Sequence, residues 1–265
     1  GGRPPLLVAI DQEGGEVKRL PEGPPDRAPA ELSAPGDERA ARDEGRRTGR
    51  YLTRLEINVD LAPVLDLARP GGAIAREQRS FGSDPQRVSS CAGAFAAALQ
   101  RSGVAPTAKH FPGLGRARIN TDDALQRIDA SRSKLRRSDE VPYREFVGDG
   151  APGRLVMLSS AIYEAFAGRP AAFTAKLATR ELRGRLGFEG VSITDALETA
   201  STESFGGPTR AARFAARAGT DLMLFAELGS AKRAAKALRG VLRRDRGRFA
   251  ASVRRVLELR SRVRG

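Results

Sequence analysis

The chain has 265 residues, of which 40% are hydrophobic and 29% are charged. This composition excludes global disorder, and the length suits a single α/β barrel domain. The sequence contains no run of about 18 apolar residues, so we predict no transmembrane segment. Cys91 is the only cysteine, which excludes an internal disulfide and a cysteine zinc site, and its apolar surroundings predict a buried side chain.

The formal net charge is +14 at pH 7, and most of the 46 basic residues are arginine. Such a charge favours contact with polyanions, including nucleic acid, an anionic wall polymer or lipid headgroups. The arginines are scattered over most helical segments, so a solvated basic surface is the alternative explanation. The chain opens with Gly1-Gly2-Arg3-Pro4, without an initiator methionine or a charged-then-apolar leader. We therefore expect any signal peptide or lipid anchor to be absent or already removed.

Six short apolar runs alternate with helical segments along the chain. Each run is rich in leucine or β-branched residues and is bounded by polar residues, glycine or proline, as expected of buried parallel strands. The runs are Leu6–Ile10, Ile57–Leu67, Ala105–Phe111, Leu155–Ser160, Val191–Thr194 and Leu222–Ala226. The helix candidates are Asp37–Leu55, Pro85–Ser102, Asp139–Val147, Ala175–Leu186, Pro208–Ala218, Ala231–Leu242 and Arg248–Arg262. This alternation predicts an α/β fold with a parallel sheet or barrel.

Two segments are typical of loops. Pro21–Pro35 is rich in proline and alanine, which predicts an ordered surface loop. Arg116–Arg137 is polar and arginine-rich, and a loop of this length in a compact domain is usually functional or mobile. An open doubly wound sheet is the structural alternative to a barrel, but no Gly-x-Gly-x-x-Gly motif follows the first strand, so a dinucleotide fold has little support.

Polar residues follow four of the predicted strands. They are Asp11, Asp66, the pair Lys109-His110, and Asp195. Barrel active sites gather at the carboxyl ends of the strands, so we expect Asp11, His110 and Asp195 to face one pocket. Glycosidic hydrolysis needs a carboxylate nucleophile or base and a proton donor across the bond, together with groups that hold the sugar hydroxyls. Asp66 is expected to be structural and to hold a neighbouring loop.

Six motifs occur in an order that resembles the catalytic barrel domain of glycoside hydrolase family 3, on the branch that removes N-acetylglucosamine. They are Leu6–Gly15 with Val17 and Arg19, Asn58–Asp66, Arg79–Pro85, Lys109–Gly113, Val191–Leu197 and Ala218–Leu222. The resemblance implies a TIM-type (β/α)8 barrel in which Asp195 is the nucleophile that forms a glycosyl-enzyme intermediate. The residues that it implies for holding the sugar are Asp11, Arg19, Arg79, Lys109 and His110.

The acid/base loop departs from that family pattern. In the resembled branch an Asp-x-His pair follows the Lys-His-Phe-Pro-Gly motif, and its histidine is the proton donor. Here Asn120 and Asp122 stand at those two positions, and His110 is the only histidine in the chain. Three readings follow: Asp122 (or Asp123) donates the proton, the protein is a weakened relative that binds sugar, or another chain or domain supplies the donor.

The number of strands is the second departure, because six candidates are present where a closed barrel needs eight. We therefore expect residues 1–265 to form one barrel domain of this family that lacks the first one or two β/α units at its N-terminus. The exposed strand edges of such a barrel would favour association.

The resemblance implies a retaining, exo-acting β-N-acetylglucosaminidase, or a related β-glycosidase, that acts on wall- or chitin-derived sugars. The alternative is a catalytically weakened carbohydrate-binding or wall-associated relative. We expect a carbohydrate partner and no cofactor or metal. Specific nucleic-acid binding is not expected, because the chain lacks a recognition motif and only 5% of its residues are aromatic. The sequence leaves the oligomeric state open, and leaves open whether the protein is located in the cell envelope, outside the cell or in the cytoplasm.

Overall fold

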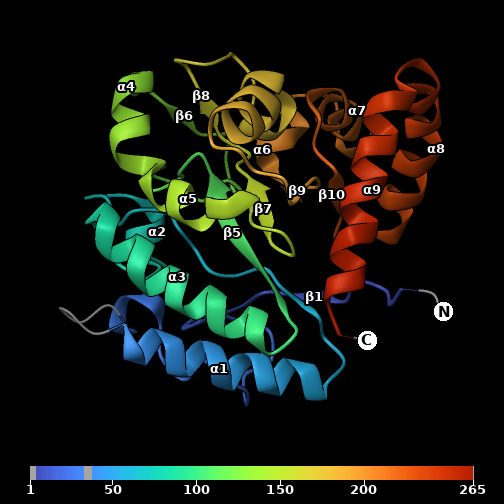
Figure 1. Cartoon of the computed structure of the whole chain (residues 1–265). Coiled ribbons are helices and arrows are strands. Elements are labelled where there is room, and N and C mark those ends of the chain that lie inside the picture. Colours follow the sequence, from blue (N-terminus) through green and yellow to red (C-terminus); the bar gives the residue numbers. More distant parts are fainter. Residues whose placement is uncertain (1–3, 33–37, 265) are drawn as a thin grey trace.

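The computed structural model describes residues 4–32 and 38–264 and contains one six-stranded sheet in which every neighbouring pair is parallel (Figure 1). The strands follow chain order: β1 (Ala9–Ile10), β4 (Val59–Asp60), β5 (Ala105–Phe111), β7 (Leu155–Leu158), β9 (Val191–Ala196) and β10 (Leu222–Leu224). All six predicted strands are therefore present. The sheet stays open between β1 and β10, so the fold is an incomplete (β/α) barrel, as the sequence predicts.

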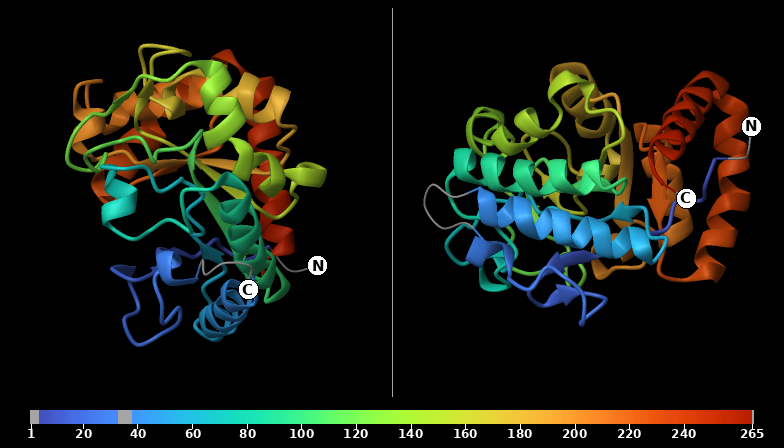
Figure 2. Two further views of the ribbon diagram at one scale, coloured as in Figure 1. Left: turned by 90° about the vertical axis from the view of Figure 1, so that its left-hand side faces the viewer. Right: turned by 60° about the horizontal axis from the view of Figure 1, so that its bottom comes forward.

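Most of the helices cover the outer face of the sheet. The α-helices are α1 (Arg39–Arg54), α2 (Ala73–Arg76), α3 (Pro85–Arg101), α4 (Arg132–Lys134), α5 (Val141–Phe146), α6 (Ala200–Glu203), α7 (Pro208–Ala218), α8 (Leu228–Arg244) and α9 (Arg246–Arg262). The 3₁₀-helices are η1 (Pro29–Leu32), η3 (Gly148–Gly150) and η4 (Ala171–Phe173). The π-helices are η2 (Leu135–Asp139) and η5 (Lys176–Arg185). In the right-hand view of Figure 2, α1 and α3 run side by side at the front of the molecule. In Figure 1, α8 and α9 stand together beside β10.

Local sequence explains where the main helices begin and end. Asp84 caps α3, because its carboxylate accepts a hydrogen bond of 2.9 Å from the Arg87 amide, and Pro85 occupies the first turn. Helix α7 ends at Gly219, which adopts the left-handed conformation (φ 94°) that favours glycine at a helix C-terminus. The turn into β10 is therefore fixed by the Ala-Gly-Thr-Asp motif.

Alternating strand residues divide the core into two layers. The outer layer joins the sheet to α3, α5, η5 and α7, and it includes buried Cys91. On the other face, Val59, Ala105, Met157 and Ile193 form a second cluster, and Leu259 of α9 packs into it. Successive side chains of a strand alternate between faces, so this inner face also carries Lys109 and Asp195, which follow Ala105 and Ile193 at even spacing. The inner apolar cluster thus lies beneath the candidate site.

Two expectations differ in detail from the structure. The segment Arg116–Arg137 is not one irregular loop, because β6 (Arg127–Ile128) pairs in parallel with β8 (Ile162–Tyr163) and α4 begins within it. The helix expected over Ala175–Leu186 is a π-helix. Parts of two predictions, the end of the loop Pro21–Pro35 and the start of the helix at Asp37, lie outside the described residues. No helix among the described residues is long and apolar enough to cross a membrane.

Candidate functional site

A cavity of about 530 Å³ lies where the strands of the sheet end. Its walls contain all seven residues that the sequence singles out as site residues: Asp11, Arg19, Arg79, Lys109, His110, Asp122 and Asp195. They come from segments that are distant in the chain, since β1, β5 and β9 each deliver a polar side chain to the same end of the sheet. The predicted site residues thus share one hollow in the described part of the chain, and their roles remain predictions.

A short hairpin brings Arg19 next to Asp11. Strands β2 (Gln12–Gly14) and β3 (Val17–Lys18) pair antiparallel, and the Arg19 amide donates to the Asp11 carbonyl at 3.2 Å. Buried Gln12 fixes this turn, because its side-chain amide donates to the Leu20 and Pro24 carbonyls and accepts from the Leu20 amide. These contacts hold the chain in a turn at this segment.

Buried Glu13 lies at the centre of a charged cluster on the cavity floor. Arg79 binds both of its carboxylate oxygens, with N–O distances of 2.8 and 2.9 Å. Lys109 lies 2.5 Å from Glu13 and 2.7 Å from Asp11. Arg79 also reaches Glu77 at 3.1 Å. Ionised donors and acceptors make the stronger hydrogen bonds, so this cluster holds the side chains that face the cavity in fixed positions.

The pKa values of the cluster follow from this pairing. Burial raises the pKa of Glu13, but the charges of Lys109 and Arg79 outweigh burial and lower that pKa to about 2. Burial lowers the pKa of Lys109, yet the carboxylates of Glu13 and Asp11 raise it above its usual value overall. Both partners are therefore charged at neutral pH. Asp60, buried beside them, has a pKa raised well above its usual value by burial.

Asp66 holds His110 and the turn after it. The imidazole Nδ1 of His110 lies 2.7 Å from the Asp66 carboxylate, and the amides of His110 and Leu114 donate to the same group. A carboxylate on one ring nitrogen fixes the orientation of the imidazole and leaves the other nitrogen available. Asp66 therefore has the loop-holding position that was expected, and it also orients the single histidine.

Asp122 and Asp195 face the same cavity from different segments. Asp195 lies in β9 and accepts a hydrogen bond of 2.8 Å from the Ala196 amide. Asp122 lies on an exposed turn, where its amide donates to the Asn120 side chain at 3.1 Å. Partial burial of the Asp122 carboxyl raises its pKa, and the negative charge of Asp195 raises it further. The two carboxyls are thus close enough to influence each other.

Two residues of the site were not predicted as such. The sequence singled out neither Glu13, which connects Arg79 with Lys109, nor Glu77, which pairs with Arg79. The available signal was the spacing, since Asp11 and Glu13 are two residues apart and so share a face of an extended segment. The sequence did not reveal that two distant cations would meet Glu13.

Known proteins resemble the chain over most of its length. The model of the glycosyl hydrolase family 3 N-terminal domain matches residues 2–259. A secreted glycosyl hydrolase of Arthroderma benhamiae is 43% identical over 224 residues, which cover 83% of this chain and 63% of that protein. A β-hexosaminidase of Alkalilimnicola ehrlichii is 38% identical over 232 residues, 84% of this chain and 65% of that protein.

Solved structures share the fold. A family 3 β-N-acetylglucosaminidase from Paenibacillus has a TM-score of 0.91 at 33% identity, and the match covers 97% of this chain and 50% of that one. The chain therefore spans less than two thirds of the length of each of these three relatives. The match over residues 2–259 and the identities above 30% show that the chain belongs to glycosyl hydrolase family 3.

Proposed function

We propose that this chain is the catalytic barrel of an enzyme that removes terminal β-linked N-acetylglucosamine, or a related β-glycoside, from wall- or chitin-derived sugars. Membership of the family and the β-hexosaminidase relative support this proposal. We also propose that residues 1–265 act as one domain. The observation that carries the proposal is one cavity whose lining includes the carboxyls of Asp122 and Asp195 together with the charged side chains of Lys109 and Arg79.

The proposed reaction retains the configuration at the anomeric carbon. The Asp195 carboxylate attacks this carbon, the glycosidic bond breaks, and the leaving oxygen takes a proton from Asp122. The Asp122 carboxylate then removes a proton from water, which attacks the same carbon and releases Asp195. The raised pKa of Asp122 supports the donor role, because a carboxyl that remains protonated to higher pH is a better proton source near neutral pH.

We propose that the remaining predicted residues hold the sugar. Lys109 and Asp11 form an ion pair at the cavity wall, and such a pair can donate to and accept from neighbouring hydroxyls. Arg19 is exposed beside Asp11 and reaches the cavity from the hairpin. His110, oriented by Asp66, offers its other ring nitrogen to a hydroxyl. Arg79 is mostly engaged with Glu13, so its contribution is to keep the cluster charged and rigid.

A second candidate function is carbohydrate binding without turnover. The exposed turn that carries Asp122 favours it, because a proton donor needs a fixed position across the glycosidic bond and an exposed turn constrains the side chain of Asp122 less. Asn120 stands beside it and cannot act as a charged partner. Asp123 and a donor from another chain or domain remain alternatives for the same proton.

The experiment compares hydrolysis of a chromogenic β-N-acetylglucosaminide with that of the matching β-glucoside, with sugar binding measured in parallel. The proposal predicts turnover of the N-acetylglucosaminide in preference to the glucoside, and loss of turnover with retained binding in Asp195→Asn. Binding of N-acetylglucosamine without turnover by the unaltered protein would support the second candidate instead. Equal turnover by the unaltered protein and Asp195→Asn would contradict the proposed site.

A further inference from the structure

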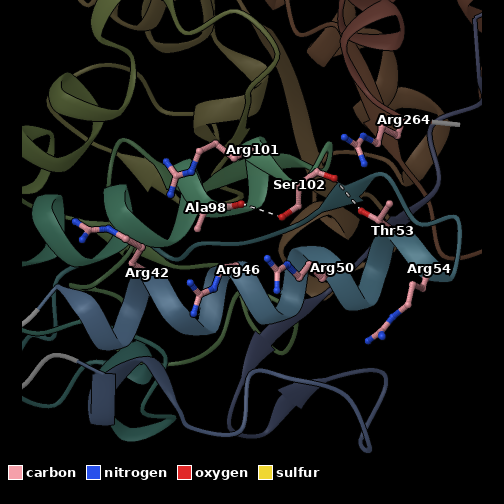
Figure 3. A pocket seen from close by; sticks show the side chains of 9 residues that line it. All are labelled: Arg42, Arg46, Arg50, Thr53, Arg54, Ala98, Arg101, Ser102 and Arg264. Atoms are coloured by element: carbon pink, nitrogen blue, oxygen red, sulfur yellow. Dashed lines mark hydrogen bonds between the residues drawn. The ribbon is translucent and has the colours of Figure 1, made fainter.

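A second hollow lies outside the candidate site, between α1 and α3, and has a volume of about 610 Å³ (Figure 3). Its lining includes six arginines: Arg42, Arg46, Arg50, Arg54, Arg101 and Arg264. We call this hollow the arginine groove. It shares no lining residue with the cavity that contains Asp195, so any ligand that it binds is separate from the sugar.

Helix periodicity aligns the arginines of α1. Arg42, Arg46, Arg50 and Arg54 are four residues apart, and residues at this spacing lie on one side of a helix. At 1.5 Å of rise per residue they repeat about every 6 Å over roughly 18 Å. In Figure 3, Arg42, Arg46 and Arg50 follow one another along α1, Arg101 extends from α3, and Arg264 lies at the end of the groove near Thr53 and Ser102. The result is a linear array of cations with others facing it.

Glycines in α1 allow the two helices to approach closely. A Cβ atom at Gly45 would lie 2.5 Å from the Phe95 carbonyl oxygen, and one at Gly49 would lie 2.7 Å from the Ser102 hydroxyl. The helices are therefore packed against each other at these positions, and the long arginine side chains project from the flank of the contact. The base of the groove is small and polar, with Thr53 bonded to the Ser102 carbonyl.

Most of these arginines have no neutralising partner among the described residues. Arg42 and Arg46 make exposed ion pairs with Glu38 and Asp43, at 3.6 and 3.0 Å. The side chains of Arg50, Arg54, Arg101 and Arg264 form no hydrogen bond or ion pair with any residue in the described ranges 4–32 and 38–264. Unpaired like charges around a concave surface raise the local positive potential, so the groove attracts an extended anion.

We propose that the arginine groove binds an extended, single-chain phosphodiester polymer through its backbone. Guanidinium groups approach from both helices, and a tetrahedral phosphate presents oxygens to both sides. The groove lining contains no aromatic side chain, so it offers no aromatic platform for bases, and recognition through the charged backbone is what its lining provides. Its concave form suits a single chain better than a flat lipid surface.

The test uses a fluorescent abasic phosphodiester strand as the probe, with anisotropy measured against salt concentration. The double variant Arg50→Gln/Arg101→Gln should bind at least about tenfold more weakly than the unaltered chain. The slope of log affinity against log salt should become shallower by about 1.4, from about 0.7 for each lost phosphate contact. The matched control Arg239→Gln/Arg243→Gln removes two exposed arginines of α8 and should bind like the unaltered chain.

Arg50→Lys/Arg101→Lys keeps the positive charges and should recover part of the affinity. This recovery distinguishes loss of charge from a folding defect as the cause of weak binding in the glutamine variant. Equal loss of binding in the α8 control would overturn the proposal, because attraction would then follow net charge alone. Competition by polygalacturonate as effective as that by the probe would also overturn it, as would stronger binding to duplex DNA or phosphatidylglycerol vesicles.

Discussion

The cavity that contains Asp195 and the arginine groove both contain arginine, but the arginine charges differ in their burial and in their pairing with carboxylates. In the cavity, Arg79 is buried and bonded to Glu13 through two nitrogens. In the groove, Arg50 and Arg101 are exposed and have no ion-pair partner in the described part of the chain. Buried charges need partners, whereas exposed ones are solvated at little cost. Net charge alone therefore does not identify a site, because pairing and burial distinguish a rigid polar site from an open basic surface.

The largest effect is expected from Asp122→Ala, which removes the proposed proton donor from the cavity. Hydrolysis of a substrate whose leaving group needs protonation should fall by about 10²- to 10⁴-fold. For a substrate with an activated leaving group, the rate of the bond-breaking step should fall much less, because this leaving group needs no proton. Comparison of kcat/KM for the two leaving groups measures this difference, with Asp123→Ala as the adjacent control. If Asp122→Ala changes neither substrate, the donor is elsewhere.

Glu13→Gln should destabilise the folded protein, because it leaves Lys109 and Arg79 without their shared anion. Breaking a buried charge pair in this way costs about 3–5 kcal/mol. Urea denaturation should show the loss as a lower midpoint. Asp43→Asn removes the exposed partner of Arg46 and should change the free energy of unfolding by about 1 kcal/mol or less. Equal effects of the two variants would contradict the contrast between buried and exposed pairs.

The pH dependence of stability should separate two buried glutamates. The pKa of Glu13 is lowered to about 2, so its contribution is present above pH 4.5 and is lost as the pH falls toward 2. That contribution is on the order of 3 kcal/mol. Glu140 has the opposite shift, because burial raises its pKa to about 7, so its ionisation removes stability as the pH rises from 4.5 through 7.

Denaturation measured across pH should therefore show that the free energy of unfolding of Glu13→Gln falls less at acidic pH than that of the unaltered chain. In Glu140→Gln, the free energy of unfolding should fall less as the pH rises toward neutral. An unchanged pH profile in both variants would mean that other groups control these transitions.

The smallest effects are expected in the arginine groove. Arg50→Gln/Arg101→Gln should leave the free energy of unfolding within about 0.5 kcal/mol, because exposed residues without partners contribute little to folding. Hydrolysis of a small, uncharged chromogenic glycoside should also be unchanged, since the groove and the cavity share no residues. Thermal unfolding and steady-state rates measure both. A large rate loss would show that the groove and the cavity are coupled.

The strands were predictable from sequence because each is a continuous apolar run, and β5 has the bounds that were expected, Ala105–Phe111. The run Ile57–Leu67 became only a short strand, Val59–Asp60, followed by an isolated bridge at Val64, since proline interrupts it at position 63. Strand β6 was missed because two residues that pair only with a distant segment leave no periodic pattern.

The site was predictable where a polar residue lies in or next to the carboxyl-terminal end of a strand, as Asp11, Lys109 and Asp195 do. The role of Glu13 in the cluster was not, because it depends on Arg79 and Lys109 arriving from other parts of the chain. Tertiary contacts of this kind carry no local sequence signal. The chemistry expected of Asp122 rests on resemblance and on its position in the cavity, and it is still a prediction.

Covalent trapping tests the central claim, that Asp195 is the nucleophile of a retaining glycosidase, most directly. The unaltered chain would be incubated with a 5-fluoro-N-acetylglucosaminyl fluoride, digested with protease, and analysed by mass spectrometry. The account predicts one added sugar on the peptide that contains Asp195, and no adduct in Asp195→Asn. An adduct on another carboxylate, or the same adduct in Asp195→Asn, would contradict it.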